Sequence, residues 1–240
     1  MGHEFCGTVI EIGSDIVNFK IGDRVLSPFT VTCGDCFYCK AGLSSRCTQC
    51  LVFGTDQLPG AQAQYVRIPL ADSTVVKAPD GLRDTSLVLM ADVFPTGYYA
   101  ASSAFSTLGP AQHSESTAVV IGCGPVGLCA IVTAADFSPR HLFAVDSVPD
   151  RLKHAQVLGG KPLDLNLGLD EVEKIVKQAT GDRGADIVIE LVGLQPALSL
   201  AFSLLRPGGV LVAMGVHNEP YPWTPSEGRR MRQQHRLRSK

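Results

Sequence analysis

Residues 117–135 read TAVVIGCGPVGLCAIVTAA, an apolar run interrupted by Gly122, Gly124, Pro125 and Gly127. The run is nearly as long as a membrane span, but its glycines and proline favour a strand, a tight turn and a helix. The glycines stand in the order G-x-G-x-x-G, which between a strand and a helix is typical of a dinucleotide-binding βαβ unit. This stretch therefore predicts a parallel sheet with a nucleotide-binding turn.

Each glycine of this turn has its own physical role in such a unit. Gly122 allows a sharp turn, Gly124 lets the backbone approach a pyrophosphate, and Gly127 lets the helix pack closely on the strand. The next apolar strand ends at Asp146, whose carboxylate would accept hydrogen bonds from the adenosine ribose and repel a 2′-phosphate. NAD is therefore expected to be preferred over NADP. Binding of NADP remains an alternative, because Arg151 lies close to Asp146 in sequence. The alternative is a glycine-rich turn that binds no ligand.

The sequence before the turn and the sequence after it predict different secondary structure. Before it, short β-branched runs bounded by Gly, Asp or Pro predict an antiparallel β domain: 7–13, 23–29 and 63–70. From Thr117 onward, apolar strands alternate with helical segments, which predicts an α/β fold with a parallel sheet. The fifth clear strand, GVLVAMGV at 209–216, is the last of this pattern, one fewer than the usual six.

Three parts are therefore expected along the chain: a partial β domain at 1–93, a Rossmann domain at 94–225 and a basic, disordered tail at 226–240. The last 13 residues carry six Lys or Arg and no acid, so the formal net charge of −2 leaves −8 on residues 1–227. An acidic body argues against nucleic acid as its main partner. A localisation signal or RNA contact is the alternative for the tail.

The eight cysteines indicate a reducing compartment, because no signal peptide precedes them. We therefore expect a cytoplasmic protein with no membrane partner. Four of the cysteines have the spacing C-x2-C-x2-C-x7-C, which lets thiolates converge on one structural zinc. Alternatives are an iron–sulfur cluster, disulfides or idle thiols. These four are Cys33, Cys36, Cys39 and Cys47, whereas small buried hydrophobes are expected at Cys6, Cys50, Cys123 and Cys129.

The two modules, with GHEFCGTVIEIGSDIVNFKIGDRV at 2–25 ahead of them, resemble the zinc-dependent alcohol dehydrogenases of the medium-chain dehydrogenase superfamily. The resemblance rests on the His3–Glu4 pair, the GDRV run, the four cysteines and the glycine turn with its acid, and it covers residues 1 to about 225. It implies a GroES-like catalytic domain, a Rossmann domain lacking its last strand, an active-site zinc, and a small alcohol or aldehyde as substrate. A homo-oligomer is among the partners that it implies.

The resemblance also assigns roles to individual residues. His3 matches a histidine ligand of the catalytic zinc, and Glu4 matches the adjacent acid that lies near or transiently on the metal. Asp92 matches a zinc ligand that is cysteine in most alcohol dehydrogenases. An aspartate at this position resembles the family members related to formaldehyde dehydrogenases and dismutases. A carboxylate is a harder ligand than thiolate, so the zinc should be a stronger Lewis acid. Thr96 and Val126 match residues beside the nicotinamide. The simpler interpretations are a helix N-cap at Asp92, a terminal histidine at His3 and a helix start at Thr96.

The sequence departs from the family pattern at its two ends. The segment that carries the family's first zinc ligand, a cysteine, is not seen before the GHE motif. His3 and Asp92 then need Glu4 as a third ligand for a tetrahedral site. Two hypotheses follow: a zinc-dependent, NAD-linked dehydrogenase, or a catalytically inactive relative that keeps the structural zinc and NAD binding. We expect about one zinc per chain, held by the four cysteines.

Overall fold

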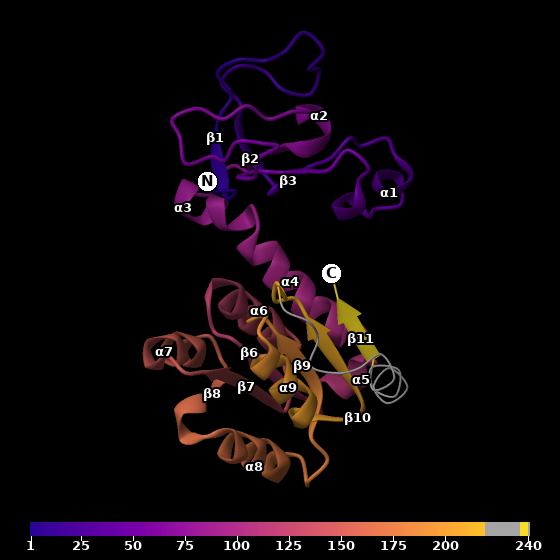
Figure 1. Ribbon diagram of the computed structural model, residues 1–240, viewed down its shortest axis with the longest axis vertical. Helices are drawn as coiled ribbons and strands as arrows, with labels where there is room; N and C mark the ends of the chain where they lie inside the picture. Colours follow the sequence, from indigo (N-terminus) through magenta and orange to yellow (C-terminus); the bar gives the residue numbers. More distant parts are fainter. Residues whose placement is uncertain (219–235, 240) are drawn as a thin grey trace. The chain divides into compact units, whose positions relative to one another are not determined.

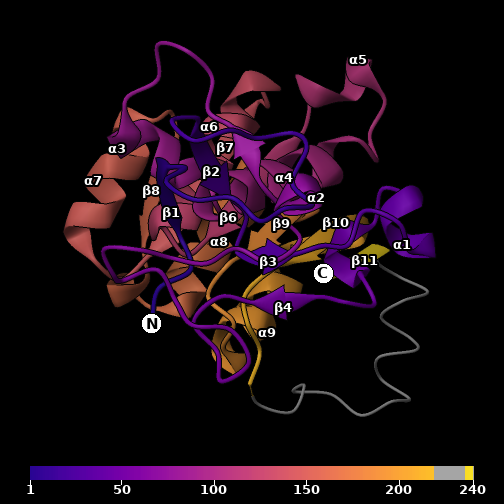
Figure 2. The same ribbon diagram turned by 90° about the horizontal axis from the view of Figure 1, so that it is seen from above.

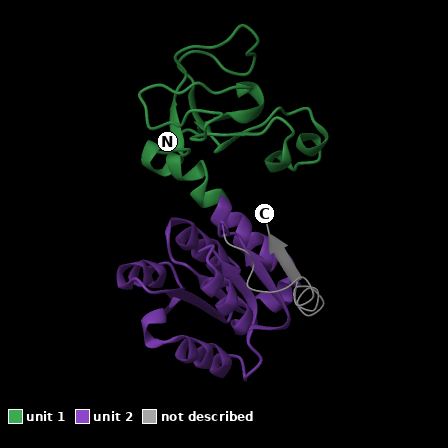
Figure 3. Cartoon of the chain, viewed as in Figure 1, with its two compact units in different colours: residues 1–95 green, residues 96–240 purple. Residues whose placement is uncertain are grey.

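The computed structural model describes residues 1–218 and 236–239 (Figures 1 and 2). The chain divides into two compact units, residues 1–95 and residues 96–240 (Figure 3). The tail predicted for 226–240 lies outside the described residues except at 236–239. Each unit has its own sheet and its own buried core.

The first unit contains a three-stranded antiparallel sheet in the order β1, β2, β5. β1 (Phe5–Thr8) pairs with β2 (Arg24–Ser27), and β2 pairs on its other side with β5 (Val76–Lys77). β3 (Thr30–Val31) and β4 (Leu51–Val52) form a second antiparallel pair. Short helical turns connect the strands: α1 (Phe37–Lys40), η1 (Ser44–Arg46), α2 (Ala71–Thr74), α3 (Asp84–Leu87) and η2 (Val88–Met90). The antiparallel β prediction for this part of the chain is confirmed.

A small apolar core holds the first unit together, and its buried members are Val31, Phe53 and Leu58. Residues 63–70 form no strand in the structure, although their pattern predicted one. Val66 and Ile68 still pack against this core from an irregular segment. The β-branched residues of this run are therefore explained by packing, because side-chain composition does not report whether the backbone has a partner strand.

The second unit is built on a six-stranded sheet, and every neighbouring pair of its strands is parallel. Its strands are β6 (Thr117–Ile121), β7 (His141–Asp146), β8 (Lys161–Asp164), β9 (Ala185–Glu190), β10 (Leu205–Ala213) and β11 (Arg236–Ser239). They lie in the order β8, β7, β6, β9, β10, β11, which is the usual Rossmann order of 3-2-1-4-5-6. The order reverses at β6, and the ends of β6 and β9 therefore flank the position where such folds bind ligands.

Helices cover both faces of this sheet. α4 (Val93–Phe105), α6 (Pro125–Asp136) and α7 (Pro149–Val157) share one buried apolar cluster with one face of the strands. α8 (Leu169–Ala179) and α9 (Gln195–Leu204) share the other cluster. Figure 2 shows α4 and α6 on the opposite side of the strands from α9. The shorter elements are α5 (Pro110–His113) and η3 (Leu165–Leu167). The doubly wound α/β prediction is confirmed.

The sheet differs from the prediction at both edges. β8, with the sequence KPLD, completes the predicted count of five, but no apolar run marked its position, because four residues with a proline carry little strand signal. β11 adds a sixth strand where the pattern predicted only five, and it places residues 236–239 in a ladder with β10 instead of in a disordered tail. The cause lies in the backbone: an edge strand offers unpaired N–H and C=O groups to any segment that reaches it. In the described residues, no helix is long and apolar enough to cross a membrane.

Candidate zinc and dinucleotide sites

The four predicted cysteine ligands converge on one point in the first unit. Cys33 follows β3, Cys36 and Cys39 lie at the start of and within α1, and Cys47 follows η1. Their four sulfur atoms all lie within 4.8 Å of one another. Two thiolates bound tetrahedrally to zinc at about 2.3 Å are about 3.8 Å apart, so the cluster can close on one ion with small movements. The residues present therefore fit a structural zinc.

Backbone amides prepare two of these sulfurs for a metal. The N–H groups of Cys39 and Thr48 lower the pKa of the Cys36 thiol to about 6. The N–H of Cys33 donates to Cys47 Sγ at 3.2 Å, and it is the main cause of the lowered pKa of Cys47. Removal from water acts in the opposite direction on Cys39 and raises its pKa to about 12. Thiolates are the form that zinc binds, so the amides favour the bound state at two of the four positions.

A second candidate metal position lies in the same unit, where His3 meets Asp92. The Nε2 atom of His3 lies 3.2 Å from Oδ2 of Asp92, although 89 residues separate them in sequence. Nitrogen and oxygen ligands at about 2.0–2.1 Å from a tetrahedral zinc are about 3.3 Å apart, so this separation suits one shared ion. The structure thus brings together two of the three residues predicted for the catalytic zinc.

Glu4 has a different partner. Its Oε1 accepts a hydrogen bond from the backbone N–H of Val93 at 3.2 Å, at the first residue of α4. A carboxylate there satisfies a free helix amide and complements the positive end of the helix dipole. Within residues 1–218, three or more metal-binding side chains converge only at the four cysteines. A third ligand beside His3 and Asp92 is therefore not in place among the residues described.

The glycine turn has the geometry that its spacing predicted. Gly122 has φ +93°, a conformation that side chains rarely adopt. A Cβ on Gly127 would lie 1.8 Å from the carbonyl oxygen of Gly122, so α6 touches the turn directly. Gly124 is the N-cap of α6, and nothing lies within 4 Å of the place where its Cβ would stand. Gly127 is thus packed against the turn, whereas the space beside Gly124 is open, and a pyrophosphate would approach there.

Asp146 sits at the end of β7, as predicted, and is only 6% exposed. Its Oδ2 accepts a hydrogen bond from the N–H of Cys123 at 2.8 Å, and its Oδ1 accepts one from Val148 at 2.9 Å. Arg151 Nη1 lies 3.6 Å from Oδ2. Asp146 therefore ties the glycine turn to the next loop, and each of its oxygens can still accept a further bond from a ribose hydroxyl.

Thr96 and Val126, predicted to lie beside the nicotinamide, belong to two helices that touch. A Cβ on Gly97 would lie 2.6 Å from the carbonyl oxygen of Val126 and 2.7 Å from Cys129 Cβ, so α4 and α6 meet backbone to backbone. Thr96 immediately precedes this contact on α4. Sequence reasoning missed Gly97, although a lone glycine inside a helical pattern is a signal of close packing.

A buried carboxylate at the end of β9 was also missed. Glu190 is fully buried, and its Oε1 accepts hydrogen bonds from the N–H groups of Val192 and Gly193, both at 2.7 Å. Its Oε2 lies 3.0 Å from His217 Nε2. A Cβ on Gly122 would lie 2.8 Å from Val192, so this loop is packed against the glycine turn. An acid ending an apolar strand was the signal that could have identified it.

A cysteine lobe in an antiparallel β unit, followed by a Rossmann sheet with an open glycine turn, defines a zinc-binding member of the medium-chain dehydrogenases and reductases. Comparison with known families agrees with this class. The alcohol dehydrogenase GroES-like domain matches residues 1–80, and the zinc-binding dehydrogenase domain matches residues 125–236. The chain belongs to the zinc-containing alcohol dehydrogenase family of the medium-chain dehydrogenase superfamily.

Individual relatives support this assignment. The chain is 55% identical over 227 residues to zinc-type alcohol dehydrogenase B of Aspergillus flavus, with 95% of this chain and 53% of the relative covered. It is 53% identical to the medium chain reductase/dehydrogenase ucsI of Acremonium sp, with 95% and 78% covered. The solved structure of alcohol dehydrogenase TADH from Thermus sp. ATN1 superposes with a TM-score of 0.87 at 32% identity, covering 100% of this chain and 68% of that one. The chain thus spans about half the length of the first relative and between two thirds and four fifths of the other two.

Proposed function

We propose that this chain functions as a zinc-dependent, NAD-linked oxidoreductase that transfers hydride between a small alcohol or aldehyde and the nicotinamide. The observation that carries the proposal is the pairing of His3 with Asp92 at 3.2 Å in a family member that also has an open glycine turn. The His3–Asp92 pair offers ligands to a metal ion that acts as a Lewis acid, and the glycine turn offers a binding site for the cofactor that carries the hydride. Two of these relatives are named alcohol dehydrogenases, which supports an alcohol, or the aldehyde that its oxidation gives, as the substrate.

The nucleotide half of the proposal rests on three positions. Gly124 leaves room for the pyrophosphate, and the first turn of α6 directs backbone N–H groups at it. Asp146 would accept hydrogen bonds from the adenosine ribose, and its charge would disfavour a 2′-phosphate. Arg151, 3.6 Å from that carboxylate, partly offsets this charge. We therefore propose NAD as the preferred cofactor and NADP as a weaker one.

The metal half rests on His3 and Asp92, which would hold the catalytic ion. A zinc ion bound there would act as a Lewis acid on the oxygen of the substrate. Glu4, bonded to Val93 at the start of α4, would fix the segment that carries Asp92 and keep a negative charge near the metal. Among the described residues, two protein ligands meet here, fewer than the three of most catalytic zinc sites.

This shortage of ligands favours a second candidate function. In it the chain keeps the structural zinc and the nucleotide site but catalyses no reaction, and it acts as a binding or assembly partner. The observation in its favour is that, among the described residues, three or more metal-binding side chains converge only at the four cysteines, while Glu4 Oε1 accepts a bond from Val93. Homo-oligomer formation and the cytoplasmic compartment remain predictions under both candidates.

Zinc stoichiometry separates the two candidates. Metal content would be measured on the purified full chain and on His3→Ala, with Cys47→Ser as the matched variant at the other site. Two zinc ions per chain, one lost in each variant, together with NAD reduction by a small alcohol, would support the dehydrogenase. One zinc per chain, unaffected by His3→Ala, together with NAD binding but no turnover, would support the second candidate and would refute the first.

A further inference from the structure

Glu190, the last residue of β9, holds two neighbouring segments at the carboxyl end of the Rossmann sheet. Its side chain is fully buried and accepts hydrogen bonds from the amides of Val192 and Gly193, in the loop after β9. Its carbonyl oxygen accepts hydrogen bonds from the N–H groups of Met214 and Gly215 at 2.9 and 3.3 Å, in the segment after β10. One residue therefore bonds to both the loop after β9 and the segment after β10.

The loop after β9 and the segment after β10 also touch backbone to backbone. A Cβ on Gly193 would lie 2.6 Å from the carbonyl oxygen of Val216 and 2.7 Å from its N atom. A Cβ on Gly215 would overlap the N atom of Gly193. The two segments therefore pack as one unit, and a shift of one requires a shift of the other.

His217 adds a further bond to this arrangement, from the segment after β10. Its Nε2 atom lies 3.0 Å from Oε2 of Glu190, whereas the loop amides bond to Oε1. The side chain of His217 is 13% exposed and that of Glu190 is 0% exposed. A buried carboxylate costs free energy unless its oxygens are paired, so an N–H group that meets Oε2 makes a strong contact. His217 thus fixes the segment after β10 to the same carboxylate that holds the loop after β9.

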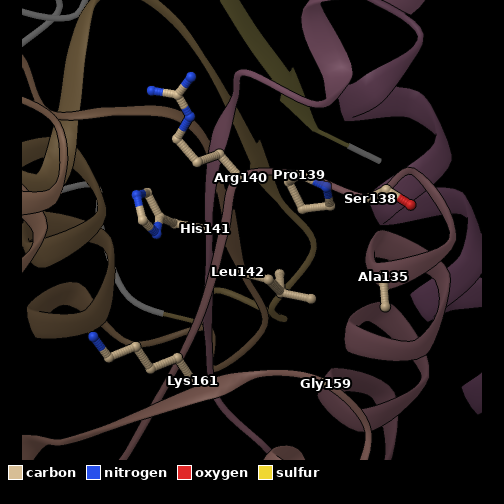
Figure 4. Close-up of a pocket in the computed structure, with 8 residues that line it drawn as sticks. All are labelled: Ala135, Ser138, Pro139, Arg140, His141, Leu142, Gly159 and Lys161. Carbon is tan, nitrogen blue, oxygen red and sulfur yellow. The ribbon is translucent and has the colours of Figure 1, made fainter.

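These groups lie in the second half of the Rossmann sheet. The fold binds a dinucleotide with two mononucleotide-binding halves, at the carboxyl ends of the strands. The first half, β6 to β8, carries the glycine turn and Asp146, so the ends of β9 and β10 would face the nicotinamide half. Val192 and Val216 are 41% and 77% exposed there, so two apolar side chains remain uncovered on closely packed backbone. The cavity in Figure 4 lies where β7 and β8 begin, at the opposite ends of the strands, and is separate from these groups.

We propose that His217, acting through Glu190, positions the loop after β9 and the segment after β10 to bind the nicotinamide half of NAD. The inference rests on the proposed function, because it takes the glycine turn as the NAD site. His217 is a positioning residue: it contacts Glu190, and Glu190 holds the backbone that would meet the cofactor.

The effect should be confined to one half of the cofactor. The glycine turn is held by other bonds, from the N–H of Gly122 to the carbonyl of Val145 and from the N–H of Cys123 to Asp146. AMP, which carries only the adenine half, should therefore bind as before when the imidazole is removed, whereas NAD should bind more weakly. A general loss of stability would instead weaken the binding of both.

The test is an equilibrium titration of the full chain with NAD and with AMP, in the parent and its variants. His217→Leu removes the N–H group and should weaken NAD binding by about tenfold, or about 1.4 kcal/mol, close to the smallest contribution of a hydrogen bond to a charged group. His217→Gln keeps an N–H group that can reach Glu190 and should restore most of the affinity. His154→Leu, which removes an exposed imidazole from α7, is the matched control and should bind NAD like the parent.

Hydrogen exchange without nucleotide tests the positioning role separately from the proposed function. The amides of residues 191–193 and 214–217 should exchange faster in His217→Leu than in the parent or in His217→Gln. Equal exchange in the three proteins would overturn the positioning role, as would unchanged NAD affinity in His217→Leu or an equal loss of NAD and AMP affinity. Absence of NAD binding in the parent would instead refute the proposed function and, with it, any cofactor role of His217.

Discussion

Replacing Gly127 by alanine and Gly124 by valine should separate the two roles of the glycine turn, stability and nucleotide binding. A Cβ at position 127 would stand 1.8 Å from the carbonyl oxygen of Gly122 and 2.9 Å from its carbonyl carbon. Carbon and oxygen atoms approach to about 3.3 Å without strain, so α6 would have to move by about 1.5 Å. Neighbouring backbone cannot rotate aside as a side chain can. We expect Gly127→Ala to cost about 3 kcal/mol of unfolding free energy, the upper part of the range for overpacked cores.

Gly124→Val should change stability little and NAD binding strongly. No atom lies within 4 Å of its Cβ, and its φ of −71° and ψ of −173° suit a β-branched residue. The expected loss of stability is under about 1 kcal/mol, which reflects the poorer N-cap. NAD binding should nevertheless weaken strongly, because the side chain would occupy the space above the turn.

The assay combines urea unfolding with calorimetric titration of NAD for both variants and the parent. Unfolding of the second unit can be followed by far-ultraviolet circular dichroism, since most of the described helices lie there. Unchanged NAD affinity in Gly124→Val would show that the turn does not bind the pyrophosphate. A loss of stability in Gly124→Val as large as that in Gly127→Ala would refute the packing argument.

Three further predictions concern the remaining polar sites. Chelation of zinc, or Cys47→Ser, should expose the amides of residues 33–50 to hydrogen exchange and leave the second unit unchanged, whereas Cys50→Ser should have no such effect. Glu190→Ala should lower the unfolding free energy by about 3–5 kcal/mol, because two amides and an imidazole lose their buried acceptor, and Glu190→Gln should cost less in the same denaturation assay. Arg151→Ala should weaken NADP binding more than NAD binding in equilibrium titrations, since the guanidinium beside Asp146 is placed to meet a 2′-phosphate.

Each of these predictions has a result that would contradict it. Zinc retention by Cys47→Ser would mean that the four sulfurs do not share one ion. A stability loss in Glu190→Gln equal to that in Glu190→Ala would show that the negative charge matters more than the hydrogen bonds. An equal change in the affinities for NADP and NAD in Arg151→Ala would show that Arg151 does not contribute to the choice between these cofactors.

Sequence patterns predicted elements well where the pattern and the fold have the same physical cause. β6 and β7 are buried on both faces, so their continuous apolar runs could only be central strands. Residues 63–70 were predicted as a strand because the run is rich in β-branched residues, yet they meet the core without pairing. β8 and β11 are short edge strands whose existence depends on the neighbour that they join. Edge pairing uses backbone groups common to all residues, so side-chain patterns report it poorly.

The local chemistry can be predicted from sequence: the spacing that lets four cysteines reach one ion, and the glycines that shape the turn after β6. Both depend on residues close together in the chain, whose geometry the backbone fixes locally. Which distant groups meet depends on the folding of the whole chain. His3 reaches Asp92 and Glu4 reaches Val93 across 89 residues, and Glu190 reaches His217 across 27. Such pairings arise from strand order and helix packing, which side-chain patterns along the chain do not report.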